Sequence, residues 1–292
     1  MDSSSDSKLS NAAISSAPVK RGPVMRIHPL LAILVAVAWS GAGFGLCMVI
    51  EMALDIKIPK LVSSLVNLPI GFLGVYYILP IVNDIPFGRV PLKDYLKRIG
   101  FYLPARWWQH ALLGVALAVC TLSAMLVASL LTGRYVLDWS QINLSHIVFS
   151  LNPGIFEEIF FRGILVMLLL PLVKSVRKAL ILQIVIFGVV HVSNLELLQV
   201  IDSFSVMIIA IAFTYAAYKT RTLLAGIVFH FLHDALLFFV QVPDGVFIGA
   251  RENIIFYSIL WLMVGVACLV IWFAAEKLNV RAERELYTPD AV

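Results

Sequence analysis

The sequence predicts an all-α, polytopic transmembrane helical bundle of about eight spans with an intramembrane polar cavity. Of its 292 residues, 61% are hydrophobic and only 14% are charged, whereas soluble domains are about 45–50% apolar and about 25% charged. Apolar runs of about 20 residues, the length that crosses a bilayer, recur along the chain with short polar segments between them. Three charged residues nevertheless lie inside one of these runs. The spans and their loops use up the chain, which excludes a sizeable soluble domain.

Each apolar run is a candidate span. The predicted spans are residues 30–50, 61–82, 111–131, 147–173, 179–192, 204–218, 223–242 and 254–275. Residues 1–26 are rich in Ser, Ala and basic residues without an apolar core, which predicts a disordered tail rather than a cleavable signal peptide. Residues 83–108 mix basic and aromatic side chains, a pattern typical of a segment at the lipid headgroups.

The distribution of Lys and Arg predicts the orientation of the spans. Basic residues concentrate before the first span and in every second connector after it, whereas the other connectors are poor in them. The positive-inside rule therefore places both termini in the cytoplasm of a multi-pass protein of the cell (plasma) membrane. The formal net charge is +4, but the basic residues flank apolar runs instead of forming one patch, which argues against nucleic-acid binding. The lipid bilayer is the predicted partner surface.

The segment Glu157-Glu158-Ile-Phe-Phe-Arg162 places two carboxylates and a guanidinium within the fourth predicted span. Ionisable groups at membrane depth cost about 2.5–3.5 kcal/mol each on insertion scales, so they indicate a functional site. Glu158 and Arg162 are four residues apart and face one another on a helix. Glu157 points elsewhere, and it needs a partner from another helix.

Two later spans supply candidate partners. His191 follows Phe187 by four residues in the fifth predicted span, about 20 Å from its start at 1.5 Å per residue. In the seventh, His230 and Asp234 are four residues apart, so the carboxylate is predicted to hydrogen-bond the imidazole and fix its tautomer. A glutamate, two histidines and an aspartate that converge inside a bundle make either a water-activating site or a metal site.

These motifs resemble those of the CPBP family of intramembrane proteases, which includes the CAAX prenyl endopeptidases and the bacteriocin-processing, Abi-type proteins. The resemblance rests on Glu157-Glu158-x3-Arg162, Phe187-x3-His191 and His230-x3-Asp234, in that order and within about 80 residues. It covers about residues 145–240. The family suggests four parts: a disordered cytoplasmic tail (1–26), N-terminal spans with an interfacial connector (27–144), a CAAX-protease-like catalytic core (145–242), and a last span with a cytoplasmic tail (243–292).

The resemblance implies a role for each residue. Glu157 and His191 would activate a water for attack on a peptide carbonyl, and His230 with Asp234 would stabilise the oxyanion. Glu158, Arg162 and Phe187 would support the geometry of the site. The cofactor stays open, because Glu157, His191 and His230 could hold zinc with an open fourth position, yet the HExxH motif is absent. The alternative is a glutamate-dependent peptidase without a metal.

The predicted activity is that of an intramembrane endopeptidase acting on a membrane-embedded or lipid-anchored peptide. Two alternatives from other classes remain open. One is a non-catalytic membrane partner, such as an immunity or regulatory protein that retains the fold. The other is a proton-coupled transporter that uses Glu157 and the histidines as a relay, although no inverted repeat is visible in the sequence.

Overall fold

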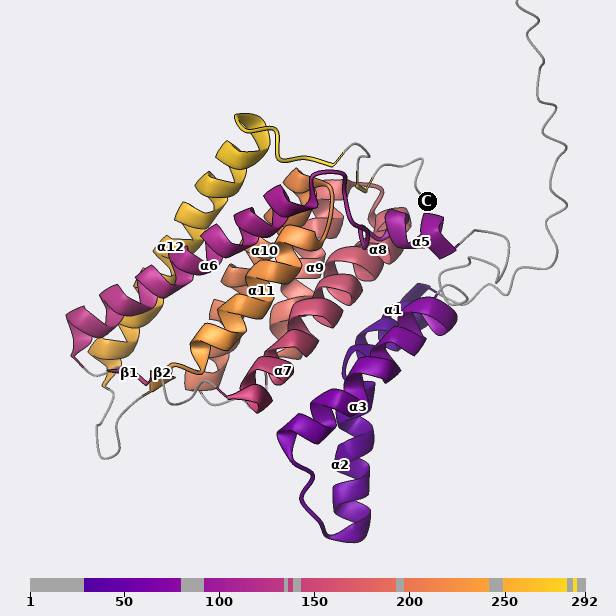
Figure 1. The fold of residues 1–292 in the computed structure, drawn as a ribbon, viewed down its shortest axis with the longest axis horizontal. Coiled ribbons are helices and arrows are strands. Elements are labelled where there is room, and N and C mark those ends of the chain that lie inside the picture. Colours follow the sequence, from indigo (N-terminus) through magenta and orange to yellow (C-terminus); the bar gives the residue numbers. More distant parts are fainter. Residues whose placement is uncertain are drawn as a thin grey trace, which may run out of the picture.

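The structure, a computed structural model, confirms an all-α polytopic helical bundle (Figure 1). It describes residues 29–79, 92–133, 136–138, 143–192, 197–241, 249–282 and 286–287. The predicted tail 1–26 and residues 83–91 of the predicted connector lie outside this part of the chain. The elements are α1 (Pro29–Ser40), α2 (Ala42–Leu54), α3 (Lys60–Leu73), η1 (Gly74–Ile78), α5 (Leu92–Arg98), α6 (Trp107–Thr132), β1 (Val136–Leu137), α7 (Leu144–Asn152), η3 (Pro153–Leu165), α8 (Val166–Val173), α9 (Val176–Val190), α10 (Leu197–Thr220), α11 (Leu224–Leu237), β2 (Val240–Gln241) and α12 (Ala250–Glu276).

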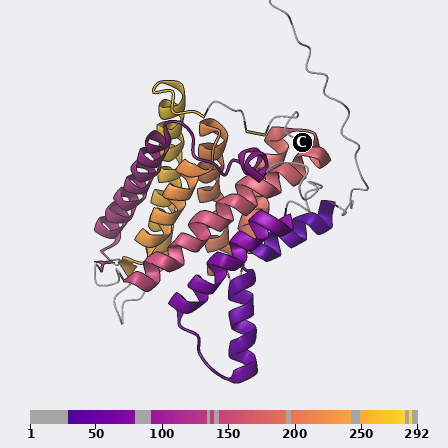
Figure 2. The same cartoon turned by 45° about the vertical axis from the view of Figure 1, so that its right-hand side comes forward.

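One long helix lies at the centre of the bundle, with other helices on both sides of it (Figures 1 and 2). It is formed by α7, η3 and α8 without a break, from Leu144 to Val173. On one side it contacts α1 and α3, and on the other it contacts α9, α10 and α11. Helices α6 and α12 pack outside α11 and α10. The central helix therefore touches most of the molecule, and side chains at its middle can meet partners from several helices.

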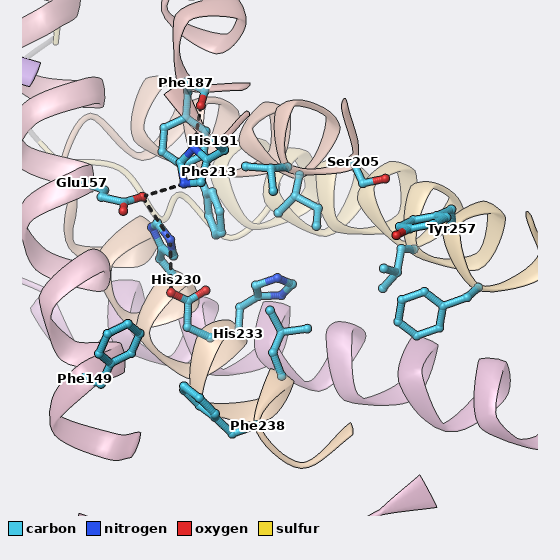
Figure 3. A pocket seen from close by; sticks show the side chains of 16 residues that line it. Phe149, Glu157, Phe187, His191, Ser205, Phe213, His230, His233, Phe238 and Tyr257 are labelled. Atoms are coloured by element: carbon cyan, nitrogen blue, oxygen red, sulfur yellow. Dashed lines mark hydrogen bonds and ion pairs between the residues drawn. The ribbon is translucent and has the colours of Figure 1, made fainter. Parts of the chain in front are cut away.

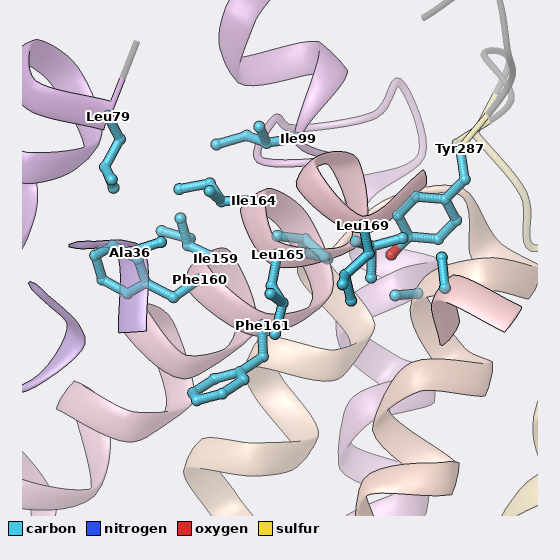
Figure 4. Packing of buried hydrophobic residues seen from close by; sticks show 14 of the residues in the cluster. Ala36, Leu79, Ile99, Ile159, Phe160, Phe161, Ile164, Leu165, Leu169 and Tyr287 are labelled. Atoms are coloured by element: carbon cyan, nitrogen blue, oxygen red, sulfur yellow. The ribbon is translucent and has the colours of Figure 1, made fainter. Parts of the chain in front are cut away.

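The middle of this helix, η3, is wound as a π-helix over 13 residues, from Pro153 to Leu165. π-Helices are rare and often mark functional sites. The outer face of η3 is apolar and packs against α1 and the segment after α5 through Ile159, Phe160 and Ile164 (Figure 4). The sequence predicted a span at this position but not its winding, because π-helical hydrogen bonding has no signature in apolar periodicity.

In the part of the chain that the structure describes, four helices are long and apolar enough to cross a membrane: residues Lys60–Ile78, Trp107–Thr132, Ser203–Thr220 and Arg251–Glu276. A fifth candidate is the pair α1 and α2, which are bent by 64° at Gly41, so the first predicted span is broken rather than straight. Helices α9 and α11 have only 15 and 14 residues, or about 21–23 Å against a hydrocarbon core of about 30 Å. The count of eight spans stays a prediction.

Two segments predicted at the surface each place a side chain in the core of the bundle. Tyr95, which the sequence placed among the interfacial aromatic residues, is 1% exposed and belongs to the core, whereas Trp107 and Trp108 are half exposed at the start of α6. In the predicted C-terminal tail, Ala282 donates its N–H to the carbonyl of Thr220, and Tyr287 is buried. The chain after α12 therefore returns to the core.

Candidate active site

A cavity of about 490 Å³ lies between the central helix and α9, α10, α11 and α12 (Figure 3). One end is polar and holds Glu157, His191, His230 and Asp234. The rest of its wall is mostly apolar or aromatic. Its further lining residues are Phe149, Phe187, Ser205, Val206, Ile209, Phe213, His233, Leu237, Phe238, Phe256, Tyr257 and Leu260. An apolar cleft with a few convergent polar groups is the usual form of a ligand site.

Glu157 lies where the two predicted histidines meet. Its Oε2 atom is 3.8 Å from Nε2 of His191 and 3.9 Å from Nε2 of His230. The side chain of Glu157 is 23% exposed and that of His191 is 33% exposed, so both face the cavity. Both separations are longer than a hydrogen bond, and Oε2 has no hydrogen-bond partner among the described residues. The structure thus brings together the groups that the sequence proposed as partners.

His191 sits at the end of α9 rather than inside it, since the helix ends at Val190. Its Nδ1 atom is 2.6 Å from the carbonyl oxygen of Phe187. A carbonyl can only accept, so Nδ1 carries a proton and the neutral ring presents a lone pair at Nε2. The ring of Phe187 packs against the imidazole at 4.6 Å between centroids. Both contacts fix the direction of Nε2 toward Glu157.

His230 is oriented by a different carboxylate from the one predicted. Its Nδ1–H donates to Oε1 of Glu158 at 2.8 Å, whereas Oδ2 of Asp234 lies 3.7 Å from Nε2, beyond hydrogen-bond range. Glu158 therefore sets the tautomer, and Asp234 lies near the opposite nitrogen. The ring of Phe213 stacks on the imidazole at 4.3 Å between centroids. His230 is held by Glu158 at Nδ1 and by Phe213 on its ring face, and the residue lines the cavity.

Glu158 and Arg162 form a pair sealed from solvent. Oε1 of Glu158 is 3.1 Å from Nη1 of Arg162, and both side chains are 0% exposed. The guanidinium lies over the ring of Phe187 at 4.1 Å and that of Phe213 at 5.1 Å, within the range of cation–π attraction. The predicted i, i+4 pair is therefore present, and the same Glu158 oxygen also accepts from His230.

Tyr287 lies in the segment that follows α12, and it is hydrogen-bonded to the helix that carries this pair. Its hydroxyl donates to the main-chain carbonyl of Arg162 at 2.5 Å. Burial raises the pKa of the Tyr287 hydroxyl, with a further contribution from the negative charge of Glu158. The hydroxyl stays protonated, so it remains a donor to this carbonyl. Tyr287 thus joins the C-terminal segment to the helix that carries both glutamates.

Two glycines, Gly226 in α11 and Gly154 in η3, allow these helices to lie close together. A Cβ atom at Gly226 would lie 2.8 Å from Oε2 of Glu158, shorter than real Cβ contacts. At Gly154, one turn before the glutamates, a Cβ atom would collide with the main chain of Phe231 at 2.9 Å. These two positions bring His230 within reach of Glu158.

Within the described residues, no group of three His, Cys, Asp or Glu side chains is arranged to hold a metal ion. The three residues that the sequence offered as ligands do converge, but Oε2 of Glu157 is nearly 4 Å from either histidine nitrogen. Nδ1 of His230 donates to Glu158, which leaves only its Nε2 as a possible ligand atom. The mechanism proposed below uses side chains and water.

Comparison with known families gives a match over residues 139–236 to the model described as Type II CAAX prenyl endopeptidase Rce1-like. Residues 139–236 are therefore similar to an Rce1-like domain. The match covers about a third of the chain and is consistent with a CPBP-family intramembrane protease, as the motifs indicated. No curated protein and no solved structure matches the chain at a significant level. All seven predicted site residues fall within the matched range, namely Glu157, Glu158, Arg162, Phe187, His191, His230 and Asp234.

Three neighbours of the site were not found from the sequence. Phe213 is one of many aromatic residues in apolar runs, and its stacking on His230 depends on how α10 packs. Gly226 resembles any helix-packing glycine. Tyr287 follows a charged stretch that suggested solvent exposure. In contrast, the rarity of charge in the spans was the signal that found the glutamates and their partners.

Proposed function

We propose that this Rce1-like domain hydrolyses a peptide bond of a membrane-held peptide with a water activated by Glu157 and His191. The observation that carries the proposal is the position of Glu157 Oε2, which faces the Nε2 atoms of His191 and His230 at one end of the cavity. A carboxylate beside two imidazoles, next to an apolar cleft, is suited to general acid and base chemistry on a bound peptide.

The first step is attack by water. A water between Glu157 and His191 donates one hydrogen to Oε2 and the other to the lone pair at Nε2 of His191, which orients its oxygen toward the cavity. As the water oxygen bonds to the peptide carbonyl carbon, Glu157 takes up the proton. Positioned proton transfer of this kind contributes about 10²–10⁴-fold to the rate.

The second requirement is a donor for the oxyanion that develops. Because Nδ1–H of His230 is bound to Glu158, donation from Nε2 requires a second proton on the ring. The carboxylates of Glu157, Glu158 and Asp234 each lie within 4 Å of a ring nitrogen and supply the compensating negative charge. A preorganised donor at an oxyanion is worth about 10²–10³ in rate.

The intermediate collapses when the carbon–nitrogen bond breaks. Glu157 returns the proton that it took from water to the leaving nitrogen, which departs as an amine. The acyl fragment keeps the OH of the water as a carboxylic acid, which becomes a carboxylate when its proton passes to Nε2 of His191. The sealed pair of Glu158 and Arg162 keeps His230 in place through the cycle because neither side chain is exposed to water. Phe187 holds His191 through its carbonyl and packs under the guanidinium.

The substrate that we propose is a peptide anchored in or on the membrane. The matched model is described as that of a prenyl endopeptidase, and the apolar wall of the cavity suits a lipid-modified peptide as well as a membrane-embedded one. Residues 145–242 would form the catalytic core. The basic connectors support a plasma-membrane protein whose two termini are cytoplasmic.

The test uses the purified full-length protein in liposomes. Internally quenched peptides would be compared: one ending in a farnesylated cysteine and three further residues, the same peptide without the lipid, and a leader peptide. Wild type is expected to cleave at least one, and Glu157→Ala, His191→Ala and His230→Ala each to lose at least about 10²-fold in rate. Equal cleavage by all four proteins would refute the assignment.

Two other results would point to the other classes. Absence of cleavage, together with stable binding of a membrane protein that is unaffected by Glu157→Ala, would indicate a non-catalytic partner. Ion-coupled uptake that is lost in Glu157→Ala, again without cleavage, would indicate a transporter.

A further inference from the structure

His233 lines the cavity but has no part in the chemistry above. It lies on α11 and is only 3% exposed. The sequence gives it no local acidic partner, so it would ordinarily be read as a structural histidine. Its ring points into the cavity (Figure 3).

One nitrogen of His233 is bound and the other is open. Nδ1 is 3.2 Å from the hydroxyl of Thr121, which is itself fully buried. The other acceptors near this hydroxyl are farther away, the Leu117 carbonyl at 3.5 Å and the Met263 sulfur at 3.9 Å. Nδ1 is the nearest of these three acceptors, so we assign the Thr121 hydroxyl as donor to Nδ1, which puts the proton of the neutral ring on Nε2.

Nothing in the described part of the chain accepts from that Nε2–H. His233 lines the cavity, where a ligand can reach this nitrogen. The rings of Phe213 and Phe229 meet the imidazole edge to face and hold its plane. The donor is thus fixed in direction and available only to a molecule in the cavity.

The distance from His230 to His233 along α11 is close to the advance of an extended peptide over one or two residues. His233 follows His230 by three residues, so it lies about 4.5 Å farther along the helix axis. An extended peptide advances about 3.3 Å per residue. A chain whose scissile carbonyl lies at His230 therefore brings the carbonyl of a residue one or two positions away to His233.

We propose that Nε2–H of His233 binds a main-chain carbonyl of the substrate, one or two residues from the scissile bond, and so fixes the register of the peptide. This rests on the proposed function. The ligand is an extended peptide backbone, and the contact is independent of side-chain or lipid chemistry. His233 is then a binding residue that selects which bond reaches Glu157.

The experiment compares His233→Phe, which keeps the ring volume, with His233→Gln, which keeps a donor, on the quenched peptide that wild type cleaves best. Loss of one hydrogen bond is expected to raise KM about 5- to 10-fold in His233→Phe with little change in kcat, and His233→Gln is expected to recover most of it. His110→Phe is the matched control, because His110 is as deeply buried as His233 but does not line the cavity. An unchanged KM in His233→Phe would overturn the proposal.

A change in the peptide tests the contact without altering the fold. Thioamides, which are weaker acceptors, would replace each carbonyl within three residues of the scissile bond. A thioamide at one of these positions is expected to raise KM with the wild-type protein but not with His233→Phe. A double-mutant cycle requires this result for a direct contact. If no position does so, the contact is absent.

Binding of a labelled peptide to the Glu157→Gln protein separates the two proposals. A loss of affinity with His233→Phe in that background supports this contact even if no cleavage is found in any assay. If cleavage depends on Glu157 but neither the affinity nor KM changes in His233→Phe, the proposed contact is refuted and the proposed function stands.

Discussion

Glu157 and Glu158 are adjacent in the sequence, but they occupy opposite environments. Glu157 is 23% exposed, faces a cavity and lies nearly 4 Å from its two imidazole neighbours. Glu158 is fully buried and contacts Arg162 and His230 at 3.1 and 2.8 Å. We call the first region, Glu157 with His191, the cavity corner, and the second, Glu158 with Arg162 and Tyr287, the sealed cluster. The loose contacts leave room for substrate and water, whereas the tight ones preserve geometry.

This contrast explains why a chain with so few charges keeps two carboxylates together. A buried ion pair is costly to form and does not by itself indicate stability. It does hold His230 at a fixed position, which a catalytic donor requires. Variants of the two glutamates should therefore fail in different ways.

The largest effect is expected for Glu158→Gln, which leaves Arg162 as a buried charge without its partner. Removal of one member of a buried pair costs about 3–5 kcal/mol, so thermal stability should fall sharply and activity with it. Glu157→Gln is the matched control, and it should unfold within about 2 °C of wild type because its side chain lacks close partners. Thermal unfolding in detergent measures both. Equal losses of stability would abolish the distinction between the two regions.

A smaller effect is expected for Gly226→Ala, which adds a methyl group 2.8 Å from Oε2 of Glu158. The carboxylate cannot retreat without loosening its contacts to Arg162 and His230, and overpacking costs about 1–3 kcal/mol. We expect about a tenfold fall in kcat with little change in KM.

The control for this variant is Gly265→Ala in α12, where an added Cβ atom meets nothing within 4 Å. It should behave as wild type in steady-state kinetics. Wild-type kcat in Gly226→Ala would show that the position of Glu158 has little influence on the chemistry.

Tyr287→Phe should have a milder effect, because it removes one hydrogen bond to the carbonyl of Arg162. Where π-helical bonding changes to α-helical bonding, one carbonyl loses its main-chain donor, and the Arg162 carbonyl lies close to that change. We expect about 1 kcal/mol of destabilisation and a loss of a few-fold in kcat.

The raised pKa of Tyr287 gives this bond a pH dependence. Its contribution to stability is complete below about pH 10, the ordinary value for tyrosine, and declines as the pH rises above it. Unfolding midpoints measured from pH 8 to 11 should show this decline in wild type but not in Tyr287→Phe. Parallel curves for the two proteins would contradict the role of the hydroxyl.

The smallest effect is expected from a metal chelator. The proposed mechanism at the cavity corner uses only side chains and water, so 1,10-phenanthroline should change the cleavage rate by less than about twofold. Inactivation by the chelator that added Zn²⁺ reverses would mean that Glu157, His191 and His230 bind a metal during turnover.

Much of the candidate site could be predicted because charge is rare in the spans. Glu157, His191 and His230 stand out against apolar neighbours, and the structure places them together. The role of Glu158 toward His230 could not be predicted, since it depends on a close helix approach at Gly226. Distance along the chain hid Tyr287, which is 125 residues from Arg162.

The same reasoning applies to the fold. Apolar composition was sufficient for a polytopic helical bundle. It could not predict the 64° bend between α1 and α2 or the winding of η3, because both leave the hydropathy of the segment unchanged. The predicted fifth span, residues 179–192, ends within two residues of the end of α9 at Val190.

The most direct test of catalysis at the cavity corner is the single-turnover cleavage rate of Glu157→Gln in liposomes, with peptide affinity measured in the same preparation. The rate should fall at least about 10²-fold while the affinity stays within about threefold of wild type, because Glu157 transfers protons during the reaction and does not hold the bound peptide. A Glu157→Gln protein that binds the peptide and cleaves it at the wild-type rate would contradict the account.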